Sequence, residues 1–172
     1  TAKPKGDYTL GAQAEMVVRL LDHLKIEKAV LCGQSMGGKV VLRVASRHPG
    51  RVSALILVDS GGVKIGKGKP ANRSVRRWPV IGPLAEALTL SSSASFVRDG
   101  LRRCYYDKAK VTTDRVATCH RVLKTRAGQS ATRATLAQAS PELTEPVISS
   151  LGQPTLIIWG AQDQLVPLEA GK

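Results

Sequence analysis

The side chain best suited to chemistry in this sequence is the hydroxyl of Ser35, which lies in a Gly-x-Ser-x-Gly motif between Gly33 and Gly37. When such a motif joins a strand to a helix, the serine stands at a sharp turn from which its oxygen can attack a carbonyl carbon. We expect both glycines to be needed because so tight a turn leaves no room for bulk. The backbone N–H of Met36 would donate a hydrogen bond to the developing oxyanion. Gly38 would let the helix lie close to the sheet.

Two predicted elements flank this motif and position its serine. Residues 29–32 form a short apolar run that is typical of a buried strand. The residues after the motif have helical spacing up to about Arg47, and a Pro-Gly pair at 49–50 is a stop signal. The alternative is a glycine-rich turn whose serine only caps the helix. Because a strand precedes the motif and a helix follows it, we interpret Ser35 as a nucleophile.

Two further apolar runs, at residues 54–59 and 155–159, are typical of strands buried on both faces. An amphipathic helix is predicted over residues 11–24. Its apolar stripe contains five side chains at helical spacing: Met16, Val17, Leu20, Leu21 and Leu24. Strands that alternate with helices favour an α/β fold with a parallel sheet and flanking helices.

The segment between the second and third strands has a different character. Residues 64–78 are rich in Gly, Lys and Arg and are predicted to be a mobile connector. Four helices are predicted around and after it, at residues 80–90, 96–106, 111–123 and 131–139. A helical insertion at the carboxyl edge of a parallel sheet can cover a ligand pocket. The sequence therefore predicts a partial core over residues 1–60 and 146–172 and a helical cap, or lid, over 61–145.

The chain is strongly basic, with a formal net charge of +13 over 172 residues. The predicted cap has 16 basic and 6 acidic side chains, so it holds most of the excess. Such a surface suits either plain solvation or an anionic substrate or partner. We expect no nucleic-acid partner, because aromatic residues are only 3% of the chain and offer few stacking platforms. Apolar runs of about six residues are too short to span a membrane.

The cysteines indicate neither a disulfide framework nor a zinc site. Cys32, Cys104 and Cys119 are odd in number and lack C-x-x-C spacing, so a reducing, cytoplasmic location is expected. Cys32, inside the first strand, is predicted to be a small core residue. We expect no metal and no cofactor, since neither a cluster of metal ligands nor a dinucleotide-binding motif is present. Nothing in the sequence indicates an oligomeric state.

In these features the chain resembles the α/β-hydrolase superfamily over nearly its whole length. The turn at 33–38 is similar to the one after that family's fifth strand, and residues 47–59 are similar to the passage into its sixth strand. Residues 154–167 resemble the seventh strand and the acid loop after it, and residues 61–145 resemble the helical cap. The branch most similar to this chain includes esterases and the hydrolases that cleave carbon–carbon bonds of ring-fission products.

The resemblance implies a hydrolase that acts on an ester or a carbon–carbon (ketone) bond of a small organic substrate. Ser35 would be the nucleophile. Asp163, in Gly160-x-x-Asp163-x-x-x-Pro167, would be the acid that orients a histidine and stabilises its imidazolium. Asp59 is the rival, because some branches place the acid after the sixth strand. In a third interpretation both carboxylates only accept loop N–H groups at the ends of strands.

The chain departs from the family's pattern in its histidines. The family's base follows an eighth strand, whereas this chain ends nine residues after Asp163 with no histidine between. The family's early strands and their His-Gly loop would precede Thr1. His23 is predicted to be exposed and His48 to end a helix, while His120 falls in the cap. We therefore expect these residues to be the middle of a longer hydrolase and almost inert alone.

Two alternatives to catalysis stay open. A non-catalytic, hydrolase-like module would use the capped pocket to bind a ligand or a partner, and the lack of a histidine after Asp163 motivates it. A basic surface binder would attach to nucleic acid or anionic membrane with a steep dependence on salt. Turnover that is lost when Ser35 is replaced would favour the enzyme over both.

Overall fold

The computed structural model describes residues 6–61, 63–64, 93–138, 143–163, 165–166 and 168–171. The chain divides into two compact units: a helical unit, formed by residues 1–8 and 72–138, and a core unit, formed by residues 9–71 and 139–172. The helix predicted at 80–90 and nearly all of the predicted connector at 64–78 lie outside the described residues.

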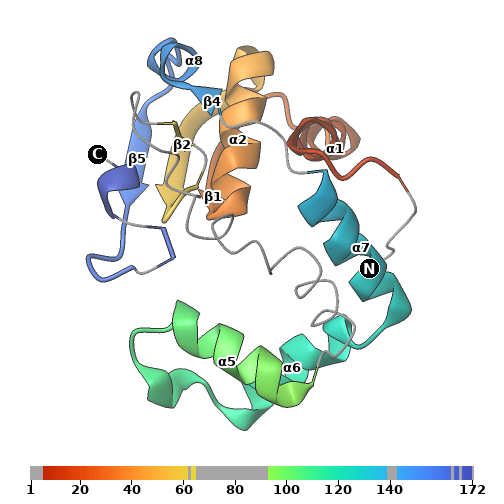
Figure 1. Cartoon of the computed structure of the whole chain (residues 1–172). Coiled ribbons are helices and arrows are strands. Elements are labelled where there is room, and N and C mark those ends of the chain that lie inside the picture. Colours follow the sequence, from red (N-terminus) through yellow and green to blue (C-terminus); the bar gives the residue numbers. More distant parts are fainter. Residues whose placement is uncertain are drawn as a thin grey trace. The chain divides into compact units, whose positions relative to one another are not determined.

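The described part of the core unit is built on a parallel sheet of three strands, β1 (Ala29–Gln34), β2 (Val52–Val58) and β5 (Thr155–Ile158), in the order β1-β2-β5 (Figure 1). In the register of the sheet, Val58 is opposite both Gln34 and Ile158. The three strands therefore end at the same edge. A short second pair joins β3 (Val63–Lys64) to β4 (Leu143–Thr144), also in parallel. The predicted α/β fold with a parallel sheet is confirmed.

Helices cover one face of this sheet. The helix α2 (Met36–Arg47) contacts β1 and β2, and α1 (Leu10–His23) packs against α2, as Figure 1 shows. The short helix α8 (Glu145–Ser149) also contacts α2. The most deeply buried apolar side chains of the core lie among these elements: Ala14, Leu42, Val44, Ala45, Val52 and Leu55. Burial of these apolar side chains supplies most of the driving force for folding this unit.

The expectation that the strands at residues 54–59 and 155–159 are buried on both faces was wrong for the described core unit. In β2, Leu55 and Leu57 are buried and the residues between and beside them are half-buried. Successive side chains of a strand point to opposite faces of a sheet. In β1, Leu31 faces the helices and is buried, whereas its neighbours Val30 and Cys32 are exposed. Cys32 is therefore not a core residue in the described part of the chain. All four residues of β5 are exposed as well.

The apolar stripe predicted for α1 was also wrong in part. The helix buries Leu10, Ala14, Val18 and Leu21 against its neighbours. Of the five predicted stripe residues, Leu21 is buried and Val17 is half-buried. Met16 and Leu20 are exposed by 64% and 54%. The sequence places apolar residues on more than one face of this helix, and the contact with α2 decides which of them are buried.

The described part of the helical unit contains α5 (Ala94–Cys104), α6 (Thr113–Leu123) and α7 (Arg126–Ala137) (Figure 1). A hydroxyl residue precedes each helix, and its side-chain oxygen accepts an N–H group of the first turn. These residues are Ser93, Thr112 and Thr125. Helices were expected in all three places. The last begins five residues before the expected start at 131, because Thr125 caps it.

One arginine side chain, from the short 3-10 turn Pro49–Arg51 directly before β2, joins that turn to α1 and to the loop after α1. The Arg51 guanidinium donates to the Asp22 carboxylate at 2.6 Å and to the carbonyl oxygens of Glu27 and Ile26 at 2.7 and 3.0 Å. We expect Arg51→Ala to lower the free energy of unfolding by about 1–2 kcal/mol, because charge-assisted bonds are among the stronger ones. Urea denaturation followed by circular dichroism measures this loss.

The matched control for this prediction is Arg51→Lys. An ammonium group keeps the charge but cannot reproduce the planar fork of donors. It should therefore recover less than half of the loss. Full recovery in the lysine variant would show that charge alone, and not the fork geometry, stabilises the loop.

A contact between α1 and the end of α2 makes the stability of the fold depend on pH. His48, which ends α2 as predicted, hydrogen-bonds through Nε2 to Oε1 of Glu15 at 3.0 Å, and Arg47 lies 3.8 Å from the same oxygen. This hydrogen bond holds the pKa of the Glu15 carboxyl below its ordinary value of 4.5, assisted by nearby positive charges and opposed by desolvation. A lowered carboxyl pKa stabilises the fold above that ordinary value. The contribution is lost as pH falls through the lowered pKa.

We therefore expect Glu15→Gln to reduce the melting temperature near neutral pH and to leave it almost unchanged well below pH 4.5. Glutamine keeps the size and an acceptor oxygen, so the difference reports the charge. Thermal unfolding of both proteins, followed by circular dichroism from pH 7 to 3, measures it. A difference that is constant over this range would contradict the assignment.

Candidate active site

Ser35 stands at the turn between β1 and α2 in a backbone conformation that serine rarely adopts. Its φ is 49° and its ψ is −115°. Such a conformation costs on the order of 1–3 kcal/mol and persists only where the surroundings hold it. Here the Ser35 N–H donates to the Val58 carbonyl at 3.0 Å, and the Ser35 carbonyl accepts from Gly38 and Gly61 at 3.1 and 3.2 Å. The neighbouring strand and the first turn of α2 thus fix the serine in place.

Close backbone approach explains two of the three glycines around the serine. A Cβ on Gly33 would lie 2.6 Å from the Gly37 carbonyl carbon, so no side chain fits there. A Cβ on Gly38 would lie 2.6 Å from the Cβ of Ser60, and the helix thus lies as close to the end of β2 as expected. A Cβ on Gly37 would meet no atom of the described residues within 4 Å. The expectation that Gly37 must lack bulk was therefore wrong, because its Cα faces open space.

The crowding at Gly33 and the open space at Gly37 predict different outcomes for two alanine substitutions. Gly33→Ala should lower the free energy of unfolding by about 1–3 kcal/mol, because the added methyl group collides with backbone atoms that cannot rotate away. Gly37→Ala is the matched control and should change stability by less than about 0.5 kcal/mol. Urea denaturation of the two variants measures both effects. Equal losses would contradict the described packing of the turn.

The hydroxyl of Ser35 is presented at the surface of the core unit. Ser35 is exposed, and its side chain makes no capping hydrogen bond to α2. The interpretation that this serine only caps the helix is therefore wrong. Met36 is the first residue of α2, where a backbone N–H has no acceptor within the helix. That N–H lies next to the serine, which is where an oxyanion donor is needed.

The loop after β5 holds Asp163 in a defined position. Asp163 is half-buried, and its Oδ1 accepts the N–H groups of Leu165 and Val166 at 2.7 and 3.0 Å. Its own N–H donates to the Gly160 carbonyl at 3.1 Å. Trp159 closes the loop through a bond from Nε1 to the Val166 carbonyl at 2.9 Å. Among the described residues, Oδ2 of Asp163 has no hydrogen-bond partner.

Asp59 follows β2 and also contacts the loop after β5. Its φ is 43°, its N–H donates to the Ile158 carbonyl at 3.0 Å, and its Oδ1 accepts the Gly160 N–H at 2.7 Å. Both aspartates thus accept loop N–H groups, which a purely structural residue at a strand end would do as well. The register of the sheet brings Ser35, Asp59 and the loop of Asp163 to one edge of the core unit.

Two of the three histidines lie far from this edge. His48 ends α2, whose 12 residues separate it from the serine turn by roughly 18 Å. His23 ends α1, from which the chain leads into β1 at its amino end, opposite the serine. It is exposed, as predicted. His120 belongs to α6 in the helical unit. The described core unit therefore holds a serine and two aspartates at its carboxyl edge without a histidine.

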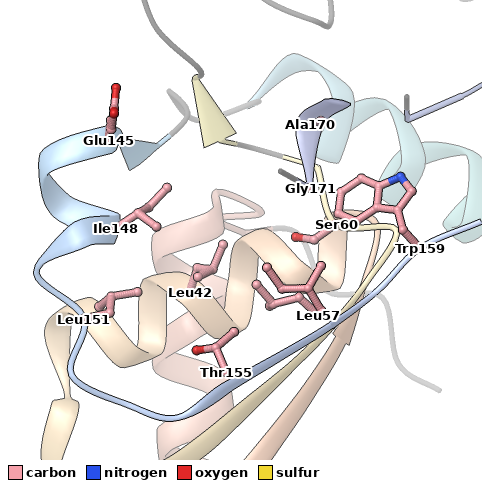
Figure 2. Close-up of a pocket in the computed structure, with 11 residues that line it drawn as sticks. Leu42, Leu57, Ser60, Glu145, Ile148, Leu151, Thr155, Trp159, Ala170 and Gly171 are labelled. Atoms are coloured by element: carbon pink, nitrogen blue, oxygen red, sulfur yellow. The ribbon is translucent and has the colours of Figure 1, made fainter. Parts of the chain in front are cut away.

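An apolar pocket of about 340 Å³ lies elsewhere in the core unit, on the face of the sheet that α2 covers. Leu42 of α2, Leu57 of β2 and Ile148 of α8 line the same space (Figure 2). Trp159 and Gly171 also line it, and Ser35 does not. The sequence did not predict this pocket, because its walls come from segments far apart in the chain.

The described residues show no group of three or more His, Cys, Asp or Glu side chains that could hold a metal ion. Among the described residues, Cys32, Cys104 and Cys119 form no disulfide bond. In the part of the chain that the structure describes, every helix is too short or too polar to cross a membrane.

Comparison with known proteins adds a family to this geometry. A family model described as the alpha/beta hydrolase fold matches residues 1–172. The chain is 28% identical over 167 residues to a putative non-heme haloperoxidase of Mycobacterium phage D29. It is 28% identical over 169 residues to a 2-hydroxymuconate semialdehyde hydrolase of Pseudomonas sp. strain CF600. These alignments cover 95% and 94% of the chain.

A solved structure shows the same fold. A meta-cleavage product hydrolase from Pseudomonas fluorescens IP01, solved with acetates, superposes with a TM-score of 0.76 at 21% identity. The match covers 99% of this chain and 60% of the other. At this identity the likeness shows the fold alone. The chain also spans only 58% and 55% of the lengths of the two sequence relatives.

Proposed function

The chain belongs to the alpha/beta hydrolase family, and we propose that Ser35 is the nucleophile of a hydrolase acting on an ester or carbon–carbon bond of a small organic substrate. The observation that carries this proposal is the strained and exposed serine at the carboxyl edge of the sheet, beside the free end of a helix. Strain of this kind clusters at active sites. A serine that served only as a helix cap would need neither the strain nor the exposure.

In the proposed reaction on an ester, Ser35 Oγ attacks the carbonyl carbon while a histidine takes the hydroxyl proton. The Met36 N–H donates to the oxyanion of the tetrahedral intermediate. The intermediate expels the alcohol, to which the histidine gives the proton, and an acyl group stays on Ser35. Water then hydrolyses the acyl-enzyme with the same histidine as base. With a carbon–carbon substrate, the same residues would direct water to a ketone.

Asp163 is proposed as the residue that orients this histidine. Its Oδ1 is occupied by two backbone N–H groups, which fixes the plane of the carboxylate. Its Oδ2, without a partner among the described residues, is left to accept the imidazole N–H. We propose that the histidine itself lies outside these 172 residues. His23 and His48 lie at the other end of the core unit, and His120 belongs to the helical unit.

The remaining parts of the proposal concern the surroundings of the site. Residues 61–145 would act as a cap, or lid, over the substrate. A small molecule would be its only ligand, and no cofactor would take part. A cytoplasmic location is proposed with it, on the odd number and the spacing of the three cysteines.

The test uses the full-length product of the gene that encodes this chain. We expect the purified protein to hydrolyse either short p-nitrophenyl esters or a 2-hydroxy-6-oxo-hexa-2,4-dienoate, both of which change colour on cleavage. The class of substrate that is cleaved identifies the bond type, ester or carbon–carbon. A folded full-length protein that binds such compounds without cleaving any of them would instead support the non-catalytic binding module.

A further inference from the structure

We propose that Asp59 is a positioning residue that holds the loop carrying Asp163. Its carboxylate would fix the peptide of Gly160, from which that loop departs. The inference rests on the proposed function, in which Asp163 orients the histidine. In this role Asp59 is neither the triad acid nor a residue that only ends the strand.

The position of β2 in the sheet is the first support. Because β2 lies between β1 and β5, Asp59 stands between the serine turn and the loop after β5. The strand register ends with Val58 opposite Ile158. Beyond that pair, two hydrogen bonds of Asp59 still join the two segments. The Asp59 N–H donates to the Ile158 carbonyl, and the Asp59 Oδ1 accepts the Gly160 N–H. The side chain thus replaces a backbone acceptor where the ladder stops.

The peptide units around Gly160 are the second support, because they connect the two aspartates. The Gly160 N–H is bound by Asp59 at 2.7 Å, and the Gly160 carbonyl accepts the Asp163 N–H at 3.1 Å. A Cβ on Gly160 would lie 3.7 Å from Asp59 Oδ1 and 3.8 Å from the Cβ of Asp163. The two aspartates therefore flank one residue, and a shift of Gly160 moves Asp163 with it. A bond to a charged acceptor is roughly twice as strong as one to a neutral acceptor.

The backbone of Asp59 decides which substitutions are informative. Its φ of 43° lies in the left-handed region, which glycine adopts freely and asparagine more readily than most residues. Asp59→Gly therefore removes the carboxylate without adding strain. Asp59→Asn keeps the conformation and the acceptor oxygen for Gly160 but removes the charge. Alanine would add strain and confuse the two effects.

The experiment measures kcat, KM and the pH dependence of kcat/KM in the full-length enzyme. For Asp59→Gly we expect kcat to fall about 10- to 100-fold with little change in KM, by analogy with the loss of partners behind a ligating group. The acid limb of the profile should move to lower pH, because a displaced Asp163 stabilises the imidazolium less. Asp59→Asn should keep kcat within about threefold and restore most of the profile.

Two results would overturn the proposal. In the first, Asp59→Gly folds and keeps both kcat and the pH profile, which would make the contact with Gly160 incidental. In the second, Asp59→Asn is as inactive as a variant lacking the triad acid while Asp163→Asn stays active. That second result would make Asp59 the acid and would overturn the role of Asp163 in the proposed function. If Asp59→Gly is not recovered as folded protein, Asp59→Asn carries the test: kcat within about threefold of the wild-type value is the expected result, and a loss as large as that of a variant lacking the triad acid would overturn the proposal.

Discussion

Replacement of Ser35 by alanine in the full-length protein is expected to lower kcat by about a million-fold, as removal of a triad nucleophile does in other serine hydrolases. The variant loses the atom that bonds to the substrate carbonyl carbon. KM should change little, because the lost oxygen contributes mainly to the transition state. Steady-state assays of purified protein with either substrate class measure kcat and KM.

The matched control is Ser53→Ala, which removes an exposed serine hydroxyl from β2. This variant should keep the full rate. A Ser35→Ala protein that retains a tenth or more of the wild-type kcat would show that another group attacks the substrate.

Replacement of Asp163 by asparagine is expected to lower kcat by about ten thousand-fold, the loss seen when a triad aspartate becomes an amide. The amide oxygen can still accept the N–H groups of Leu165 and Val166, so the loop should keep its shape. The amide NH2 group, however, cannot accept a hydrogen bond from the imidazole N–H or stabilise the positive charge of the histidine. The base is then held in the wrong tautomer.

Asp107→Asn is the control for this change. Asp107 also accepts a backbone N–H two residues on, that of Ala109 at 2.9 Å, but it lies in the helical unit. Its replacement should leave kcat within about twofold. A loss below tenfold in Asp163→Asn, together with a large loss in Asp59→Asn, would transfer the role of the acid to Asp59.

The strands and the serine turn are predictable from sequence because their signals are local. Apolar runs located β1, β2 and β5, and the Gly-x-Ser-x-Gly motif located the turn around Ser35. The stop after Arg47 was found because proline and glycine act on the backbone directly. Each of these features depends on residues within about ten positions of one another.

Burial was harder to predict because it depends on distant neighbours. Cys32 and Met16 have apolar side chains of the kind that protein cores contain, yet both are exposed in the described core unit. An apolar side chain is buried only where another element packs on it, and local periodicity does not say which element that is. The error at Gly37 has the same origin, because the crowding at this turn falls on Gly33 and Gly38.

The contact between Asp59 and Gly160 could not be predicted for a topological reason. The two residues lie 101 positions apart and meet because β5 returns beside β2 after the helical insertion. Sequence alone offered Asp59 as a rival to Asp163 or as a residue that accepts loop N–H groups at a strand end, without naming the loop. The register of the sheet shows that both can serve one loop.

The most direct test of the central claim is covalent labelling of the full-length protein with a fluorophosphonate, followed by mass spectrometry of the peptides. A serine activated by a histidine forms a stable adduct with this reagent, whereas an ordinary surface serine does not. We expect one adduct, on the peptide that contains Ser35, and no adduct when the protein is denatured before the reagent is added. An active protein that is labelled at another residue, or not at all, would contradict the assignment of Ser35 as the nucleophile.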